Sequence, residues 1–302
     1  MNQHNPERLT RFNELRPLLF SIAYRMLGRV MDAEDILQEA YLRWERAADT
    51  EVRDAKAFLT AVVTRLCIDQ MRAGRSQRET YIGPWLPEPL LSADVSPSDA
   101  AELAESLSFA FLVLLEKLSP VERAVFLLRE IFDYEYAEIA RIVNKSEANC
   151  RQLTKRAQEH LRANKPRVHP SRETEQNVLN NFVSAMFKGD VAGVLTLLSP
   201  DITFISDGGG KAVSARRPIY GADKVARFLF GVYKKIPSDF TFEVGTANSY
   251  PALVAFSAGK PYLVMAFEIS GDKICNIYNV RNPDKMRHLE QGRDDPAGTG
   301  AG

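Results

Sequence analysis

The sequence predicts a multidomain protein in which two all-α domains precede an α+β domain. Residues 9–77 are nearly all helix-forming and contain one proline after the first few positions, and residues 100–164 are helical in character again. Between them, residues 81–98 carry four prolines and a glycine, which disfavour helix. From residue 173 the pattern changes from helix to strand. Helices followed by a sheet indicate the α+β class for this last part.

These shifts in composition divide the chain into five expected segments. The length of 302 residues suits two or three domains. The last residues have the composition of a disordered tail. The expected segments are a helical domain at 1–78, a linker at 79–99, a second helical domain at 100–165, an α+β domain at 173–289 and a tail at 290–302.

The overall composition excludes several classes of protein. Hydrophobic residues make up 45% of the chain and charged residues 26%, with a formal net charge of zero, as in ordinary globular proteins. No stretch approaches the roughly 18 apolar residues of a membrane span, and the N-terminus lacks the apolar run of a secretory signal. Cys67, Cys150 and Cys275 lie far apart, with no CxxC or Cys/His cluster. We therefore expect a cytoplasmic protein with reduced thiols, no membrane partner and no metal.

The helix expected from Asp32 combines an apolar stripe with an acidic face. Asp32 is expected to cap this helix, with Asp35 at the capping-box position. Residues 31–51 carry seven acidic and two basic side chains, whereas residues 52–78 carry two acidic and six basic ones. This reversal suggests a basic protein surface as one partner and nucleic acid as the next, or else two solvated faces of a helical bundle. The apolar stripe is formed by Ile36, Leu37, Ala40, Tyr41 and Trp44.

A basic helix after a tight break is the most informative local feature. Residues 138–143 form a short amphipathic piece, residues 144–145 break it, and the hydroxyl of Ser146 is suited to cap the next helix. Residues 141–167 hold eight Lys/Arg against two Asp/Glu, whereas residues 119–140 hold two against five. A helix-turn-helix whose second helix alone is cationic fits a phosphate-lined DNA groove. The side chains expected to pack inward are Leu153, Ala157 and Leu161.

The last domain combines amphipathic helices with alternating strands. Its helices are expected at 175–188, 191–198 and 221–236. Its strands are expected at 201–207, 240–244, 252–257, 262–269 and 273–280, with a turn at 270–272. This order favours a curved antiparallel sheet.

Three stretches together resemble one family. Asp32–Trp44 (DAEDILQEAYLRW), Ala57–Asp69 (AFLTAVVTRLCID) and the helix-turn-helix at Leu118–Leu161 resemble a bacterial sigma factor of the extracytoplasmic-function type. The resemblance implies that the acidic helix docks on the β′ clamp helices of core RNA polymerase and that the second helical domain meets the β flap. It also implies that the basic helix and the loop before it melt and hold the promoter −10 element, while the helix-turn-helix reads the −35 element.

The C-terminal part resembles the SnoaL-like cone, a fold that encloses an apolar pocket. Tyr81–Pro89 (YIGPWLPEP), Asp207–Lys211 (DGGGK) and Asn282–Lys285 (NPDK) resemble the subgroup of these sigma factors that carries such a domain. The resemblance implies that the fused domain replaces a separate anti-sigma protein, that it contacts the sigma domains and the linker, and that its far C-terminal tail tunes activity. The implied regulatory residues are Trp85, Leu86, Pro87, Glu88, Pro89, Asp207, Gly208, Gly209, Gly210, Lys211, Asn282, Pro283, Asp284 and Lys285.

The resemblance also implies the residues that bind polymerase and the −10 element. The implied polymerase-binding residues are Asp35, Gln38, Glu39, Leu42 and Trp44. The implied −10 contacts are Arg53, Lys56, Arg65, Asp69, Arg72 and Arg75. Arginine contacts to phosphate position a strand without specifying sequence. The loop at 46–56 contains no aromatic residue on which an extruded base could stack.

On the basic helix, the expected division is between base readout and phosphate contact. Residues near the start of a recognition helix meet base edges, so Asn149, Gln152 and Arg151 are expected to read bases. Lys155, Arg156 and Arg162 are expected to bind phosphate. With Ser146 at the cap, the implied −35 set is Ser146, Asn149, Arg151, Gln152, Lys155 and Arg156.

Several positions have a second interpretation. Trp44 lies on an apolar stripe, so the alternative to a polymerase contact is that its side chain belongs to the core. Trp85 is a candidate buried anchor of the linker, and the glycines at 208–210 are also explained by a plain turn. The alternative function is a SnoaL-like enzyme or small-ligand sensor coupled to a DNA-binding module, with Asp207 as base. The preferred interpretation assigns no catalytic residue and no cofactor, and leaves any ligand of the pocket unidentified.

Overall fold

The structure is a computed structural model that describes residues 6–47, 54–74, 80–91, 107–161 and 170–291. Its internal contacts group Met1–Thr80 with Ala110–Lys165 in one compact unit, and Tyr81–Phe109 with Pro166–Gly302 in a second. The two predicted helical domains therefore share one unit, while the linker belongs with the C-terminal domain. No helix in these described ranges combines the length and apolarity needed to cross a membrane.

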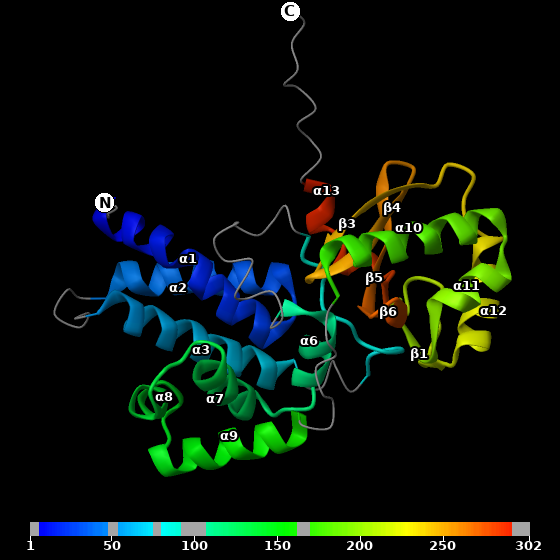
Figure 1. The fold of residues 1–302 in the computed structure, drawn as a ribbon. Helices are drawn as coiled ribbons and strands as arrows, with labels where there is room; N and C mark the ends of the chain where they lie inside the picture. The colour runs from blue at the N-terminus through cyan, green and yellow to red at the C-terminus, as the bar shows by residue number, and fades with distance from the viewer. Residues whose placement is uncertain (1–5, 48–53, 75–79, 92–106, 162–169, 292–302) are drawn as a thin grey trace, which may run out of the picture. The chain divides into compact units, whose positions relative to one another are not determined.

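The first three helices of the helical unit pack around one apolar core. They are α1 (Pro6–Leu27), α2 (Val30–Arg46) and α3 (Ala55–Ala73), drawn in blue to cyan in Figure 1. Leu19, Leu37 and Leu59 are fully buried among them. The predicted start of α2 at Asp32 is wrong, because the helix begins two residues earlier with Arg29 at the N-cap position. Asp32 lies in the first turn, where its carboxylate is 3.4 Å from the Arg29 guanidinium and interacts favourably with the positive end of the helix dipole.

The helix-turn-helix is confirmed in the same unit. It comprises α7 (Pro120–Glu130), α8 (Tyr136–Val143) and α9 (Glu147–Leu161), preceded in the chain by α6 (Phe109–Leu115). Ser119 forms a capping box with Glu122 at the start of α7. Asn144 ends α8 in the left-handed conformation at φ 53°, and the Ser146 hydroxyl accepts a bond from the Asn149 amide at 3.2 Å. The part of the predicted basic helix beyond Leu161 lies outside the described residues.

The second unit holds an α+β domain. Its helices are α10 (Arg172–Lys188), α11 (Val191–Leu197), α12 (Ala222–Tyr233) and α13 (His288–Gln291), with a short 3-10 turn η4 at Pro283–Lys285. Its strands are β1 (Leu198–Asp207), β2 (Ile219–Tyr220), β3 (Thr241–Ala247), β4 (Tyr250–Ser257), β5 (Lys260–Ser270) and β6 (Lys273–Val280).

The six strands form one sheet in the order β2-β1-β6-β5-β4-β3. The predicted antiparallel sheet is wrong in one respect, because β1 pairs in parallel with β6 while the other neighbours are antiparallel. The chain leaves β1, forms α12 and the β3–β6 meander, and returns beside β1 in the same direction. The sequence did not predict β2, which is only two residues long and shows no alternation. Register shifts in β4–β5 and β5–β6 fit the bending of a curved sheet.

The core of this domain lies between the sheet and helices α10 to α12. Phe182 from α10 meets Phe267 from β5 edge to face, with 5.2 Å between ring centroids. Phe204 of β1 lies 5.0 Å from Phe228 of α12. The helices and the concave face of the sheet leave a cavity between them, and the linker docks at the carboxyl ends of β1 and β6.

Candidate functional site

The acidic helix α2 presents one exposed face. Asp35, Gln38 and Leu42 are exposed at spacings of three and four, which place them on the same side of the helix. Leu42 keeps 46% of its surface exposed and adds an apolar side chain to this face. Glu39 is half-buried beside them, and its carboxylate accepts a hydrogen bond from Arg43 at 2.8 Å. Four of the five predicted polymerase-binding residues therefore remain accessible.

Trp44 is the exception, and its predicted polymerase contact does not fit the structure. It is only 4% exposed. Its ring lies 6.3 Å from that of Phe12, and the Arg8 guanidinium sits 5.9 Å from its centroid. Trp44 continues the apolar stripe of α2, so burial of its large ring stabilises the bundle, as the core interpretation predicted.

The predicted −10 residues on α3 also share a face. Arg65, Asp69 and Arg72 are exposed at spacings of four and three. Asp54 caps α3 and accepts a bond from the Lys56 amide at 2.9 Å. Two further predicted contacts, Arg53 and Arg75, lie outside the described residues.

Two arginines tie the helical domains of this unit to each other. Arg65 of α3 donates to the carbonyls of Arg141 and Ile142 at the end of α8, at 2.8 Å each. In the reverse direction, Arg123 of α7 donates to the Met26 carbonyl near the end of α1 at 2.7 Å, and also to Leu115 at 2.6 Å. The last carbonyls of a helix lack intrahelical partners and carry the negative end of its dipole, so a guanidinium is a suitable cap.

A buried hydroxyl pair joins the same two helical domains. Thr60 of α3 and Tyr134, which precedes α8, share a hydrogen bond of 2.9 Å. Burial raises the pKa of Tyr134, so its hydroxyl stays protonated over the physiological range. The arrangement holds α3, the predicted −10 helix, against α7 and α8.

On α9 the predicted DNA-facing side chains are all exposed. The set is Ser146, Asn149, Arg151, Gln152, Lys155 and Arg156. Arg151 also pairs with Glu147 at 2.9 Å. The predicted inward set needs a correction: Ala157 is buried, whereas Leu153 and Leu161 are only half-buried. Cys150 and Thr154 complete the buried stripe, because small side chains at these positions let α9 lie close to its neighbours.

In the second unit, a buried ion pair binds the linker. Asp207 ends β1 and is fully buried, and Lys285 is 3% exposed. Their charged groups lie 2.7 Å apart. The Leu86 amide donates to the Asp207 carboxylate at 2.8 Å, and the Lys285 ammonium donates to the Leu86 carbonyl. One residue of the linker, Leu86, is thus held by opposite charges at its N–H and at its carbonyl.

Around this pair the three sequence motifs converge. The Tyr81 hydroxyl donates to the Asp207 carboxylate at 2.6 Å and accepts a bond from the side-chain amide of Asn282 at 2.9 Å. The Asp207 carboxylate also accepts a bond from the Gly209 amide at 3.0 Å. Gly209 has φ 56°, and a Cβ there would lie 2.1 Å from the Asn282 nitrogen, so this position requires glycine. A Cβ on Gly210 would likewise meet Ile82 at 2.8 Å, and one on Gly208 would meet the Ala212 carbonyl at 2.4 Å.

Trp85 is not the buried anchor that the sequence suggested. It is half-buried, with its ring 4.2 Å from the Lys285 ammonium. The buried part of the linker is instead the run Leu86, Pro87, Glu88, Pro89 and Leu90. Beside it, Lys211 of the glycine loop pairs with Asp284 of η4, which follows the exposed Pro283. The hydrogen bond from Lys211 holds the pKa of Asp284 below its usual value.

Two linker contacts were missed by the sequence analysis. At the β3–β4 turn, the Asn248 side chain accepts a bond from the Leu90 amide and its own amide donates to the Leu90 carbonyl, both at 2.9 Å. The Asn248 side chain also donates to Leu107 at 3.0 Å. The His288 ring lies 2.8 Å from the Pro89 carbonyl, which can only accept, so Nε2 carries the proton. Asn248-Ser249 could have been predicted as a turn, but its partner in the linker has no local signal.

The cavity on the concave face of the sheet has a volume of about 570 Å³. Asp207 is not among its lining residues, although the neighbouring Ser206 is. Successive strand residues point to opposite faces, so Ser206 faces the cavity while Asp207 faces the linker. The base considered for an isomerase-like site is therefore committed to the linker contact. The described residues that line the cavity include no Asp, Glu or His.

The two helical domains define a class of protein. Residues 11–77 match the Sigma-70 region 2 family, and residues 108–161 match the Sigma-70 region 4 family. The chain is 38% identical to the ECF RNA polymerase sigma factor SigJ of Mycobacterium tuberculosis, over 97% of this chain and 98% of that protein. It is 30% identical to the probable ECF sigma factor SigI of the same organism, over 96% of this chain and 98% of SigI.

A solved structure extends this likeness to the whole fold. The crystal structure of SigJ from Mycobacterium tuberculosis matches with a TM-score of 0.73 and 35% identity, covering 92% of this chain and 98% of that one. The chain belongs to the extracytoplasmic-function family of RNA polymerase sigma factors, and its C-terminal α+β domain is part of the likeness to SigJ.

Replacing Lys285 with methionine should release the linker. The Lys285→Met variant leaves the buried Asp207 carboxylate without its counter-ion, and breaking such a pair costs about 3–5 kcal/mol. We expect hydrogen exchange at the Leu86 amide to accelerate roughly 100-fold or more. Lys224→Met, at an exposed position on α12, is the matched control and should leave exchange at Leu86 unchanged. Unaltered protection in Lys285→Met would show that the ion pair does not hold the linker.

Glycine-to-alanine exchanges should separate backbone strain from the loss of the linker contact. Gly271 has φ 61° in the β5–β6 turn, and no atom of the described residues lies within 4 Å of the place that a Cβ would take. Gly271→Ala therefore adds only left-handed strain of about 1–2 kcal/mol. Gly209→Ala adds the same strain and also displaces Asn282 from Tyr81. We expect proteolytic cleavage within residues 80–91 to increase in Gly209→Ala alone; equal cleavage in both variants would contradict this.

Proposed function

We propose that this sigma factor engages core polymerase through the exposed face of α2 and promoter DNA through α3 and α9. The residues assigned to each partner remain exposed in the folded protein. Asp35, Gln38 and Leu42 are exposed on α2, and Lys155 and Arg156 are exposed on α9. The assigned polymerase contacts are the β′ clamp helices for the first helical domain and the β flap for the second. The −10 element is assigned to α3 and the −35 element to α9.

The free protein holds its two DNA-binding parts in a closed arrangement. Arg65, an assigned −10 contact, is occupied by the carbonyls at the end of α8. Its Nε and one terminal nitrogen are engaged there, so the guanidinium must turn away from these carbonyls to present its full fork to a phosphate. Opening of the helical unit therefore precedes promoter binding, and polymerase supplies the competing surface.

The C-terminal domain restrains this opening through the linker. The linker connects the two helical domains along the chain, and the domain fixes residues 81–91 by the Asp207–Lys285 pair and by Asn248. A held linker limits how far the helical domains separate. The observation that carries this proposal is the burial of Leu86 between the two charges. The domain thus acts as a built-in negative regulator, and the chain as a binding protein that needs no cofactor.

The second candidate function is a ligand-sensing or enzymatic role of the C-terminal cavity. Its size favours binding of a small molecule. Catalysis by proton abstraction is less well supported, because Asp207 faces the linker and the described lining residues hold no other carboxylate. We therefore favour the regulatory role with a sensing cavity over an enzyme.

Run-off transcription with core polymerase tests the proposal. Templates would be fragments of the genomic DNA of the source organism, and the proteins would be the full chain and truncations after Asn164 and after Pro283. We expect a promoter-dependent transcript from the full chain and a higher yield once Lys285 and the tail are removed. No promoter-dependent transcript from any form would refute sigma activity, and identical yields from all forms would refute the restraint.

Leu42 should contribute to polymerase binding. Leu42→Ala removes an exposed apolar side chain at the centre of the proposed face, and we expect the Kd for core polymerase to rise about tenfold. Leu9→Ala removes a leucine of similar exposure, 43%, from α1 and should leave the affinity unchanged. The measurement is fluorescence anisotropy of labelled protein titrated with core enzyme. Equal effects of both substitutions would argue against this face.

Arg156 and Gln152 should affect DNA binding in different ways. Arg156→Ala removes a phosphate contact, so binding should weaken on all sequences alike and the salt slope should fall by about one. Gln152→Ala should instead lose discrimination at one base pair of a −35 element. Arg227→Ala, an exposed arginine on α12, is the control. A loss of binding confined to one base position in Arg156→Ala would contradict the phosphate assignment.

A further inference from the structure

The cavity of the C-terminal domain has walls suited to an aromatic ligand. Eight of its lining residues are Phe or Tyr, contributed by α10, β1, α12, β3, β5 and the segment between α12 and β3. Phe187 and Phe242 stack at 5.3 Å, and Phe240 meets Tyr262 at 6.0 Å. The volume of about 570 Å³ lies in the range of cavities that bind small organic molecules. Flat rings fit such walls better than a branched polar molecule does.

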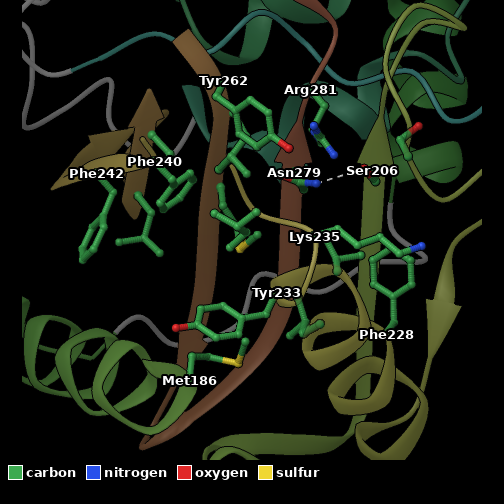
Figure 2. A pocket seen from close by; sticks show the side chains of 18 of the residues that line it. Met186, Ser206, Phe228, Tyr233, Lys235, Phe240, Phe242, Tyr262, Asn279 and Arg281 are labelled. Atoms are coloured by element: carbon green, nitrogen blue, oxygen red, sulfur yellow. Dashed lines mark hydrogen bonds between the residues drawn. The ribbon is translucent and has the colours of Figure 1, made fainter. Parts of the chain in front are cut away.

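Four polar side chains of the cavity gather at one end, and Lys235 lies apart from them. Figure 2 shows Tyr262, Arg281, Asn279 and Ser206 close together, while Met186 and Tyr233 lie toward the other end. Asn279 and Arg281 are two apart on and just after β6, so they face the same side. The Arg281 guanidinium lies 4.4 Å from the Tyr262 ring centroid.

This polar end lacks a full set of hydrogen-bond partners. Asn279 is 5% exposed and donates to the Ser206 hydroxyl at 3.0 Å, while its carbonyl oxygen has no partner among the described residues. Arg281 donates through one terminal nitrogen to the Val213 carbonyl at 3.0 Å, but its Nε has none within the same ranges. Buried polar atoms are nearly always paired in folded proteins. Because the Ser206 hydroxyl can also donate, the Asn279 amide can turn over and present its NH₂ group without losing this bond.

The charged residues that line the cavity favour a negatively charged ligand. Its described lining residues include two cations, Lys235 and Arg281, and no carboxylate. Neither cation has an ion-pair partner within the described residues. Lys235 is exposed to solvent, whereas Arg281 is half-buried with its Nε out of contact with solvent, so the Arg281 charge beside apolar walls attracts an anion more strongly.

We propose that this cavity binds an aromatic carboxylate, with its rings among the phenylalanines and its carboxylate at the Arg281–Asn279 end. The guanidinium and the turned amide supply N–H donors for the carboxylate oxygens. The described lining residues offer no carboxylate or imidazole that would transform such a molecule by proton abstraction, so the site binds it without turnover.

The polar end of the cavity adjoins the linker contact. Ser206 precedes Asp207 on β1, and Arg281 precedes Asn282 after β6. The Arg281 amide donates to the Asp207 carbonyl at 2.7 Å. A carboxylate that orders Arg281 therefore stiffens the strand ends that hold the linker. This coupling rests on the proposed regulatory function, whereas ligand binding itself does not.

Calorimetric titration of the full chain tests the binding site without polymerase. The probes are biphenyl-4-carboxylate and biphenyl-4-methanol, which share their rings and differ in charge. We expect one molecule of the carboxylate to bind about tenfold or more tightly than the alcohol. Arg281→Gln should remove this preference while the alcohol still binds. Arg227→Gln, on the exposed side of α12, should keep it.

Several outcomes would overturn the proposal. They are equal affinity for the two probes, an unchanged preference in Arg281→Gln, or no binding of either probe to the folded chain. Asn279→Asp serves as the second variant if Arg281→Gln fails to fold, and its negative charge at the same end should weaken the preference. For the coupling, hydrogen exchange at Leu86 should slow at saturating biphenyl-4-carboxylate. Binding without any change at Leu86 would remove the coupling and leave the site, and neither result depends on transcription.

Discussion

The structure of the C-terminal unit depends on the buried ion pair between Asp207 and Lys285. Each partner sits at the end of a strand or just beyond it, where the parallel pairing of β1 and β6 brings the two chain segments together. Two charges taken out of water are costly unless further hydrogen bonds satisfy them. Here those bonds come from Tyr81, Leu86 and Gly209, so the linker completes a site that would otherwise be unsatisfied. Docking of the linker therefore contributes directly to the stability of the domain.

In the helical unit, charged hydrogen bonds from two arginines to backbone carbonyls take the place of the buried ion pair. Arg65 and Arg123 each reach into the other helical domain and cap carbonyls at a helix end. Such caps contribute modest energy individually, and they satisfy carbonyls that water also satisfies. The closed arrangement is thus specific and yet reversible. In the proposed function, a polymerase surface on α2 and promoter phosphates at Arg65 would compete with it directly.

Much of the fold followed from local sequence patterns. The break at Asn144, the cap at Ser146 and the strand at 273–280 were predicted because capping, charge and alternation act over a few residues. The start of α2, the parallel partner of β1 and the buried stripe of α9 were not, since each depends on tertiary packing. Within the site, Asp207 and Lys285 came from motif resemblance, while Asn248 and His288 were missed because their partners are more than 150 residues away in sequence. The half-buried position of Trp85 was likewise decided by Lys285 and not by the neighbouring prolines.

The central claim is that the free sigma factor is closed and that polymerase opens it. The most direct test is an electron–electron distance measurement in the full chain between nitroxide labels at Asn13→Cys on α1 and Glu159→Cys on α9, both exposed and outside the proposed interfaces. The three native cysteines are buried. We predict a single narrow distance distribution in the free protein and a longer one after core polymerase is added. A distribution that is broad in the free protein, or that does not change on polymerase binding, would contradict the account.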